Sequence, residues 1–365
     1  MQTIATTRPT SGRQINKRHF RGLIPVVLAL TTGVVSPVSA QTPSFQSLGQ
    51  MPGSLYGTYA NAVSANGDAV VGYAWVSSNN RQAFRWTRTN GFQSLGDLGG
   101  GDSDAYATSF DGAVVVGQSA GTTGALSGFR WTLAGGMTAL PFYEATAVSA
   151  DGSMAAGMNV WWKTSGEMGT FGFFPGSNNT STLGLSADGQ VAVGAAIHGA
   201  GRFGPTHHAF RWTPLGGLQD LGVTTGDESD ARAVSGDGQV IVGEARDKSQ
   251  FWRAFRWTAS GGMRDIGTLG GPMSVANAAS QNGAVVVGTS LTTGLTSSNR
   301  AFRWTAKKGL QDLKKELQSA GIHTADNWIL SSASGVSADG TVIVGYGFSP
   351  SSQWESFRIV LPLPK

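Results

Sequence analysis

The chain has 365 residues, of which 53 are glycine, 13% are charged and none is cysteine. The absence of cysteine excludes disulfides, thiolate metal sites and a cysteine nucleophile. Abundant glycine together with 17 Phe and 11 Trp is typical of a β-rich chain with many tight turns. The length accommodates one large closed domain or two ordinary ones.

The first 40 residues have the pattern of a secretory signal peptide. Basic residues precede an apolar run from Leu23 to Val35, and Val38-Ser39-Ala40 forms a small-residue cleavage site. The alternative is a retained membrane anchor, but a span needs about 20 apolar residues, and this run is shorter and contains Pro25. We therefore predict that residues 1–40 are a signal peptide and residues 41–365 a single secreted or periplasmic domain.

Removal of this segment changes the charge of the chain. The whole sequence has a net charge of +4, but residues 1–40 hold five of its 26 Lys and Arg and none of its 22 Asp and Glu, which leaves 21 basic residues and a net charge of −1. This balance argues against nucleic-acid binding. No second long apolar segment follows, so we also predict no membrane span, and we expect a monomer.

A short motif recurs seven times in the remaining chain. Each copy has Asp-Gly or Asn-Gly, with a serine two residues before the dipeptide and a glycine six residues after its first position, as in Ser64, Asn66 and Gly72. The dipeptides begin at Asn66, Asp111, Asp151, Asp188, Asp237, Asn282 and Asp339.

These dipeptides lie between apolar runs, which predicts a β-hairpin with a type I′ turn. Each copy then supplies two antiparallel strands, A and B. The aspartates could instead be metal ligands or catalytic acids, but the turn accounts for all of them and also accepts asparagine.

Two further motifs predict strands C and D. Phe-Arg-Trp-Thr occurs at Phe84, Phe129, Phe210, Phe255 and Phe302, with degenerate forms at Trp161 and Phe357. Its aromatic side chains are expected to pack between neighbouring sheets. A fourth apolar segment begins six residues after the tryptophan, as in "GFQSLG" and "GLQDLG".

The last copy lacks its strand D, but an extra copy, Phe45 to Gly49, precedes the first strand A and repeats Phe92 to Gly96 without a change. A circular fold requires such a split, because the first strand then completes the last sheet and removes its exposed edge. An open solenoid would instead need capping ends. We predict an all-β, seven-bladed β-propeller of four-stranded blades.

Leu310, Leu313 and Leu317 recur at helical spacing and predict one short inserted helix near residues 312–320.

The repeats resemble the bacterial extracellular HAF-repeat family, named for a His-Ala-Phe run that stands here at His208 to Phe210 and continues as Arg-Trp-Thr. The pieces "AFRWT", "GLQDLG" and "SADGTVIVG" extend the resemblance over most of residues 41–365. Other copies carry Gln82 or Arg253 in place of the histidine. The resemblance implies export from bacterial cells, and it implies no particular activity.

The B–C and D–A connections vary in length, whereas the A–B and C–D turns do not. The variable connections emerge on one side of a four-stranded meander, which is therefore the candidate functional face. Candidate ligand-binding residues on it are the tryptophans outside the repeated position and two adjacent histidines: Trp75, Trp252, Trp328, Trp354, His207 and His208.

Three copies carry an acid seven residues before the turn dipeptide, namely Asp104, Glu144 and Asp230. If strand A is innermost, these carboxylates would meet near the channel mouth and could cleave glycosidic bonds or hold a hard cation. A solvated acidic rim is the alternative.

The sequence has no nucleophile elbow, phosphate loop, zinc-binding motif or dinucleotide fingerprint. We predict a non-catalytic module without cofactor or metal that binds a protein or glycan, with a carbohydrate-active enzyme as the second hypothesis.

Overall fold

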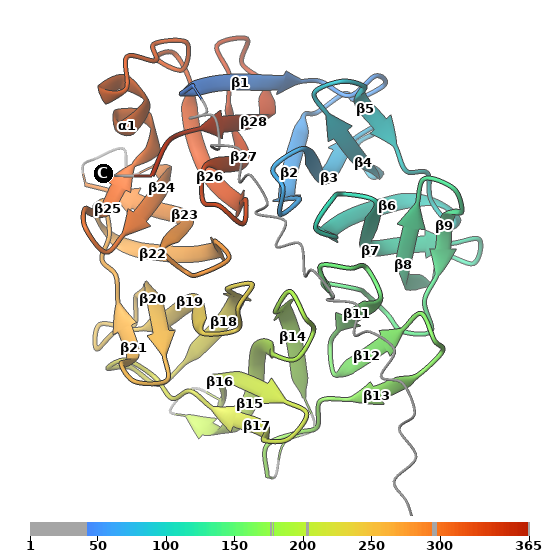
Figure 1. Cartoon of the computed structure of the whole chain (residues 1–365), viewed down its shortest axis with the longest axis vertical. Helices are drawn as coiled ribbons and strands as arrows, with labels where there is room; N and C mark the ends of the chain where they lie inside the picture. Colours follow the sequence, from blue (N-terminus) through green and yellow to red (C-terminus); the bar gives the residue numbers. More distant parts are fainter. Residues whose placement is uncertain (1–41, 176, 178, 202–203, 294–297, 364–365) are drawn as a thin grey trace, which may run out of the picture. The chain divides into compact units, whose positions relative to one another are not determined.

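The computed structural model describes residues 42–175, 177, 179–201, 204–293 and 298–363. The predicted signal peptide, residues 1–40, lies outside this range. Residues Ala40–Lys365 form one compact unit, in which seven four-stranded antiparallel sheets make a ring (Figure 1). The predicted seven-bladed β-propeller is therefore confirmed.

Every blade follows the order A–B–C–D. Blade 1 consists of β2 (Thr58–Val63), β3 (Ala69–Trp75), β4 (Arg81–Thr87) and β5 (Gly91–Ser94). Blade 2 consists of β6 (Gly99–Thr108), β7 (Val114–Gly121), β8 (Leu126–Thr132) and β9 (Gly136–Ala139). Blade 3 consists of β10 (Ala147–Val148), β11 (Met154–Gly157), β12 (Val160–Lys163) and β13 (Met168–Thr170).

The other four blades repeat this plan. Blade 4 consists of β14 (Thr180–Leu185), β15 (Ala192–Gly201), β16 (Gly204–Thr213) and β17 (Gly217–Asp220). Blade 5 consists of β18 (Ser229–Val234), β19 (Val240–Arg246), β20 (Trp252–Thr258) and β21 (Gly262–Asp265). Blade 6 consists of β22 (Gly270–Ala279), β23 (Val285–Thr292), β24 (Asn299–Thr305) and β25 (Gly309–Asp312). Blade 7 consists of β26 (Ile329–Val336), β27 (Val342–Phe348), β28 (Trp354–Val360) and β1 (Ser44–Gly49).

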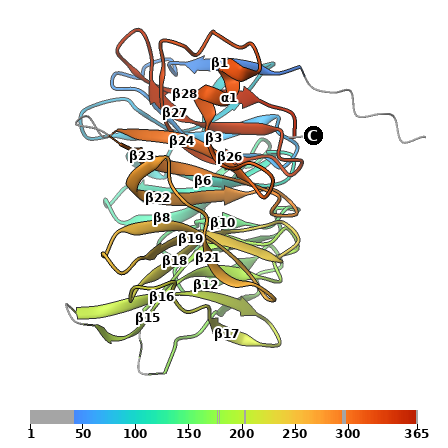
Figure 2. The same cartoon turned by 90° about the vertical axis from the view of Figure 1, so that its left-hand side faces the viewer.

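The A strands are innermost. Each of the seven contacts the A strands of both neighbouring blades, so they surround the central channel, and the D strands lie at the rim (Figure 1). The A–B and C–D turns lie on one side of the disc, which we call the turn face, and the B–C and D–A connections lie on the other, the loop face. Figure 2 shows the disc edge-on, with the long β15–β16 hairpin reaching out beyond its neighbours on the loop face.

The ring closes as the split repeat predicts. Strand β1 pairs antiparallel with β28, with Ser44 opposite Val360 and Phe45 opposite Ile359. The ring of Phe45 also contacts the rings of Trp328 and Phe357, at centroid distances of 5.2 and 6.1 Å. Blade 7 is thus built from the two ends of the described chain.

The A–B turns are not of the predicted type I′. Only their glycine has a positive φ, as at Gly67 with +80°, whereas a type I′ turn requires a positive φ at both central residues. The repeated serine explains the difference. Ser64 Oγ donates to Asn66 Oδ1 at 2.6 Å and accepts from the amide of Ala69 at 2.9 Å, which holds a four-residue loop in place of a two-residue turn.

The same side-chain bonds recur in all seven turns. The turns are in addition joined to each other by seven backbone hydrogen bonds of 2.8–3.0 Å that pass from each blade to the next and return to the first. Their donors are Asn66, Phe110, Ala150, Ala187, Asp237, Gln281 and Ala338. On the turn face the channel is therefore bordered by a continuous backbone ring.

The second repeated glycine serves a close approach of strands A and B. A Cβ at Gly72 would clash with the carbonyl oxygen of Tyr59, and the equivalent glycine of every other blade meets the corresponding oxygen in the same way. Strand A of blade 1 has a bulge between Ala60 and Ala62 at this level. Any larger residue would push the inner strand away from its blade.

The core lies between blades. Phe84 and Trp86 are two residues apart and face the same side of β4, where they pack with Val342, Val344 and Val360 of blade 7. The phenylalanine of the Phe-Arg-Trp-Thr motif, or its equivalent, is fully buried in six blades. The intervening arginine often crosses to the next blade, as when Arg85 Nε donates to the Gly112 carbonyl at 2.7 Å. Each blade therefore depends on its neighbours for its core.

The inserted helix is confirmed. Helix α1 (Leu313–Ser319) follows β25 directly, and Asp312 caps its first turn by accepting from the amide of Lys314 at 2.8 Å. Leu313 and Leu317 are fully buried against blade 7, in the same cluster as Trp328. The helix covers the outer edge where blades 6 and 7 meet (Figure 1).

Removal of β1 should open the ring. A chain that begins at Met51 should lose at least about 3 kcal/mol of unfolding free energy relative to one that begins at Gln41, because Phe45 and Leu48 no longer cover blade 7. It should also aggregate through the exposed edge of β28. Thermal unfolding and light scattering of the two chains measure this, and equal melting temperatures would contradict ring closure.

Candidate functional site

Three of the four predicted tryptophans lie at strand ends on the loop face with part of their side chains exposed. Trp75 ends β3, Trp252 begins β20 and Trp354 begins β28. Trp252 is half-buried under the guanidinium of Arg246, whose Cζ lies 5.0 Å from its ring centroid. Trp328 corrects our expectation, since only 5% of it is exposed and it packs in the core beside α1. Its position outside the repeat reflects the inserted helix.

Trp75 and Trp354 belong to one aromatic cluster across blades 1 and 7. Tyr59 stacks on Tyr73 with a centroid distance of 5.0 Å and on Trp354 with 6.0 Å. Tyr346 meets Tyr59 edge-on at 5.2 Å, and Trp75 meets Tyr73 edge-on at 6.2 Å. We call these five residues the aromatic cluster.

The three tyrosines were not predicted as site residues, although the sequence contains a signal for two of them. Tyr73 and Tyr346 each follow the repeated glycine of strand B, a position that holds no aromatic residue in the other five copies. Blades 1 and 7 become neighbours only through ring closure. A comparison of the copies at this position, combined with closure, would have found the pair.

A cavity of about 330 Å³ adjoins the cluster on the loop face and is lined by Tyr56, Tyr59, Trp75 and Ser78. Tyr56 is 54% exposed and Trp354 36% exposed. The volume is at the lower end of the range for small-molecule pockets. Aromatic rings therefore form an accessible surface beside an open cavity.

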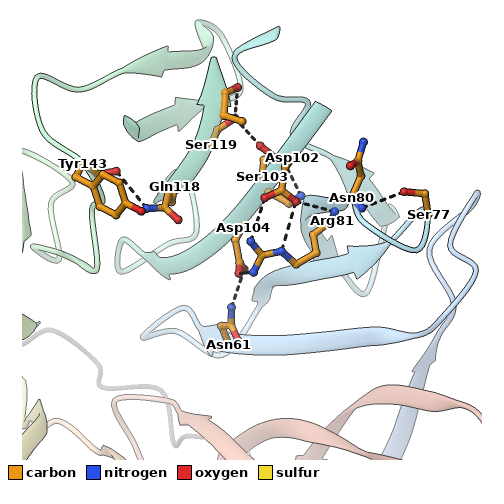
Figure 3. A network of polar contacts seen from close by, with 12 residues as sticks. Asn61, Ser77, Asn80, Arg81, Asp102, Ser103, Asp104, Gln118, Ser119 and Tyr143 are labelled. Atoms are coloured by element: carbon orange, nitrogen blue, oxygen red, sulfur yellow. Dashed lines mark hydrogen bonds and ion pairs between the residues drawn. The ribbon is translucent and has the colours of Figure 1, made fainter. Parts of the chain in front are cut away.

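A charged network around Arg81 (Figure 3) adjoins the aromatic cluster through the contacts of Arg81 with Tyr73 and Trp75. The guanidinium of Arg81 binds Asp102 at 3.0 Å and Asp104 at 2.9 Å, and its Cζ lies 5.5 Å from the Tyr73 ring centroid and 5.7 Å from that of Trp75. Arg81 is thereby fixed between two carboxylates and two aromatic rings.

Asp104 is the most deeply buried of the three predicted acids, with 3% exposure. Its carboxylate accepts from Asn61 Nδ2 at 3.1 Å in addition to Arg81. Burial raises the pKa of Asp104 to about 7, and Arg81 and Asn61 oppose this rise. The side chain thus titrates near neutral pH in the folded protein.

The surroundings of Asp230 are separate from those of Asp104 and Glu144. Burial raises the pKa of Glu144. Burial, followed by the charge of Glu244, raises the pKa of Asp230, while His207 and Arg232 lower it. Asp104 and Glu144 share a neighbour, because burial and then both of their charges raise the pKa of Tyr106. Asp104 and Glu144 therefore both act on Tyr106, whereas Asp230 interacts with Glu244, His207 and Arg232.

The central channel has its own cavity of about 310 Å³. Its lining comes from blades 1 and 3 to 7 and is mostly neutral: Asn61, Thr146, Leu183, Arg232, Asn277, Ser332, Ser334 and Tyr346. Arg232 is paired with Glu244 at 2.5 Å. None of the three predicted acids contributes to this lining.

The adjacent histidines point to different partners. They alternate along β16, and His207 is exposed and lies close enough to Asp230 to lower its pKa. His208 instead lies 2.9 Å from Asp220 through Nδ1, and its ring stacks on that of His198. His198, His208 and Asp220 are the one group of three potential metal ligands found within the described residues.

No helix in the part of the chain that the structure describes is long and apolar enough to cross a membrane. No protein-family model matches the chain, and no curated protein matches it.

The chain is similar in fold to several solved β-propellers. Oligogalacturonate lyase from Vibrio parahaemolyticus has 9% sequence identity and a TM-score of 0.55, with 88% of this chain and 98% of that chain covered. The β-propeller domain of the Trilobed protease from Pyrococcus furiosus, described as having an open velcro topology, has 12% identity and a TM-score of 0.54, with 84% and 96% covered. TolB from Acinetobacter baumannii has 11% identity and a TM-score of 0.46, with 81% of each chain covered. At these identities the likeness to the lyase and to the Trilobed protease domain shows the fold alone.

The raised pKa of Asp104 predicts a pH dependence of stability. The folded state favours the protonated carboxyl, so this group stabilises the fold fully below about pH 4, and the contribution is lost as pH rises through about 7, by at most about 1.4 kcal/mol per pH unit. The free energy of unfolding of the wild type minus that of Asp104→Asn should therefore fall between about pH 5 and about pH 8.

Denaturant unfolding of both proteins across this pH range measures the effect. Asp68→Asn, which removes an exposed carboxylate in the neighbouring blade 1, is the matched control for the loss of a surface charge. A difference for Asp104→Asn that is independent of pH, or one that grows as pH rises, would contradict the assignment.

Proposed function

We propose that the protein is an exported, non-catalytic member of the HAF-repeat family and that its loop face binds an oligosaccharide through the aromatic cluster. The observation that carries this proposal is the joint exposure of Trp75, Trp354 and Tyr59 beside a cavity of about 330 Å³. The repeated core does not need these rings, because Phe84 and Trp86 already fill the layer between blades 1 and 7.

The chemistry of the cluster favours a sugar over a protein partner. Flat aromatic faces pack against the C–H groups of pyranose rings, and the neighbouring Asp102 and Arg81 offer hydrogen-bond acceptors and donors for hydroxyl groups. Both residues are partly exposed and already fixed by one another. A pocket of this size suits one or two sugar units, whereas a protein interface typically covers about 800 Å² on each partner.

The surroundings of the acids support binding rather than cleavage. Glycosidic hydrolysis needs two carboxyl groups about 5–9.5 Å apart around the scissile bond. Asp104 is held by Arg81 and Asn61, and Asp230 belongs to a different group of charges. The competing proposal, a carbohydrate-active enzyme that uses Asp104, Glu144 and Asp230, predicts turnover that is lost when the three are replaced together.

The proposal that the protein is exported rests on its N-terminal sequence. The basic residues, the apolar run and the Val38-Ser39-Ala40 site together favour delivery to the periplasm or the medium. Extracellular and cell-envelope polysaccharides are available there, which is consistent with an oligosaccharide ligand.

Binding to a panel of oligosaccharides tests the proposal. Trp75→Ala and Trp354→Ala should each weaken binding of any sugar that the wild type retains by at least about fivefold, because truncated aromatic anchors often cost more than about 1 kcal/mol. Their melting temperatures should change little, since both side chains are partly exposed. Isothermal titration calorimetry and thermal unfolding provide the two measurements.

Trp252→Ala is the matched control, because this tryptophan lies on the same face in blade 5 and outside the cluster. It should retain full affinity. The proposal fails if no oligosaccharide binds, if Trp252→Ala weakens binding as much as Trp75→Ala, or if capture from the native extracellular fraction identifies a protein at the same surface. Release of shortened sugars that ceases in the triple acid variant would establish the enzyme instead.

A further inference from the structure

Three potential metal ligands converge on the loop-face side of blade 4. His198 Nε2 and His208 Nδ1 lie 3.1 and 2.9 Å from the same carboxylate oxygen, Oδ2 of Asp220. One nitrogen from each ring and one carboxylate oxygen all fall within 4.8 Å of one another. This group is independent of the aromatic cluster.

Three adjacent strands supply these residues. His198 lies at an irregularity in β15 between Ile197 and Gly199, His208 pairs in β16 with Ala196, and Asp220 is the last residue of β17. Strands B, C and D of one blade are hydrogen-bonded to each other in sequence order, so the three residues belong to one sheet. A site built on strands is better preorganised than one built on loops.

The surroundings already orient two of the ligands. The amide of Gly222 donates to Oδ1 of Asp220 at 2.7 Å, as Gly267 does to Asp265 in blade 5. Nδ1 of His208 lies 2.9 Å from Oδ2 and 3.1 Å from Oδ1 of this fixed carboxylate. The ring of Phe174 contacts His198 edge-on at 5.6 Å. Both contacts hold their side chains in place before any ion binds.

The repeat itself does not account for this group. The equivalent place in blade 5 holds a single ion pair, Arg253 with Asp265 at 3.1 Å, which needs no third residue. In blade 4 the arginine is replaced by His208, and His198 is added from strand B with its ring stacked on His208 at 4.1 Å and 5°. Two stacked imidazoles that share one carboxylate oxygen are an unusual substitute for a simple ion pair.

We propose that His198, His208 and Asp220 bind a divalent transition-metal ion, with Zn²⁺ as the preferred ion. Two imidazoles and a carboxylate form the set of three protein ligands typical of an open zinc site, in which water takes the fourth position. Imidazole also disfavours Mg²⁺ and Ca²⁺, which prefer oxygen ligands. The side chain of His198 is 44% exposed and can turn out of the stack to point its nitrogen at the ion.

Titration of the untagged, chelator-treated protein with ZnCl₂ tests the proposal by calorimetry. The wild type should bind one equivalent, and His198→Ala, His208→Ala and Asp220→Asn should each weaken this binding at least about tenfold, as expected for the loss of a ligand when even supporting residues cost 10- to 100-fold. At the same Zn²⁺ concentration, the melting temperature of the wild type should rise more than that of any of the three variants.

Two control variants separate this site from ordinary surface histidines. His207→Ala removes the exposed neighbour of His208, and His323→Ala removes the histidine of another His–Asp pair, 3.1 Å from Asp326. Both should bind Zn²⁺ as the wild type does. His198→Ala changes an exposed side chain and so keeps the test valid even if His208→Ala fails to fold. The proposal is overturned if the wild type shows no saturable binding, if the three variants keep their affinity, or if the controls lose it equally.

Discussion

The pairing of β1 with β28 is the interaction on which the rest of the structure depends. The hydrophobic clusters lie between blades, so a blade without its neighbour exposes the side of its core that the neighbour covered. Six of the seven junctions join blades that follow one another in the sequence. The seventh brings together the two ends of the described chain, and without β1 it would leave an unpaired strand edge and the uncovered partners of Phe45. The backbone ring of the A–B turns, in which Ala338 donates to Ala65, closes at the same junction.

Closure also assembles the candidate binding site. Tyr59 and Trp75 come from blade 1, whereas Tyr346 and Trp354 come from blade 7, and their rings meet only because the last blade lies beside the first. Gly57 illustrates how close this approach is, since a Cβ there would collide with the backbone of Trp354. The junction with the largest entropic cost of closure is therefore also the one that carries the aromatic surface. The proposed metal site, in contrast, lies within a single blade and does not depend on the junction.

The fold could be predicted in detail because each repeated residue has one structural task. The serine and Asp-Gly dipeptide make the turn, the second glycine admits the close approach of strands A and B, and the split repeat requires closure. The predicted turn type was wrong because the amide of Ala69 donates a hydrogen bond to Ser64 Oγ, which widens the loop, and the Asp-Gly or Asn-Gly dipeptide alone does not reveal this bond. The site was harder to predict for a similar reason. Trp328 and Trp75 both lie outside the repeated tryptophan position. Trp328 is buried under α1, whereas Trp75 lines an open cavity, and the sequence alone does not distinguish the buried tryptophan from the accessible one. His198 and Asp220 were missed because their meeting depends on the register of three strands.

Cross-linking of β1 to β28 tests closure most directly, and the absence of native cysteine makes it unambiguous. Ser44 and Val360 are opposite each other, so Ser44→Cys with Val360→Cys should form an intramolecular disulfide on mild oxidation of the folded protein. Ser44→Cys with Ile359→Cys shifts the pair by one residue, which places the two side chains on opposite faces of the sheet, and should remain reduced. Non-reducing electrophoresis and peptide mass spectrometry distinguish the two outcomes. The account predicts a disulfide in the first pair only; equal cross-linking of both pairs, or none in the first, would contradict it.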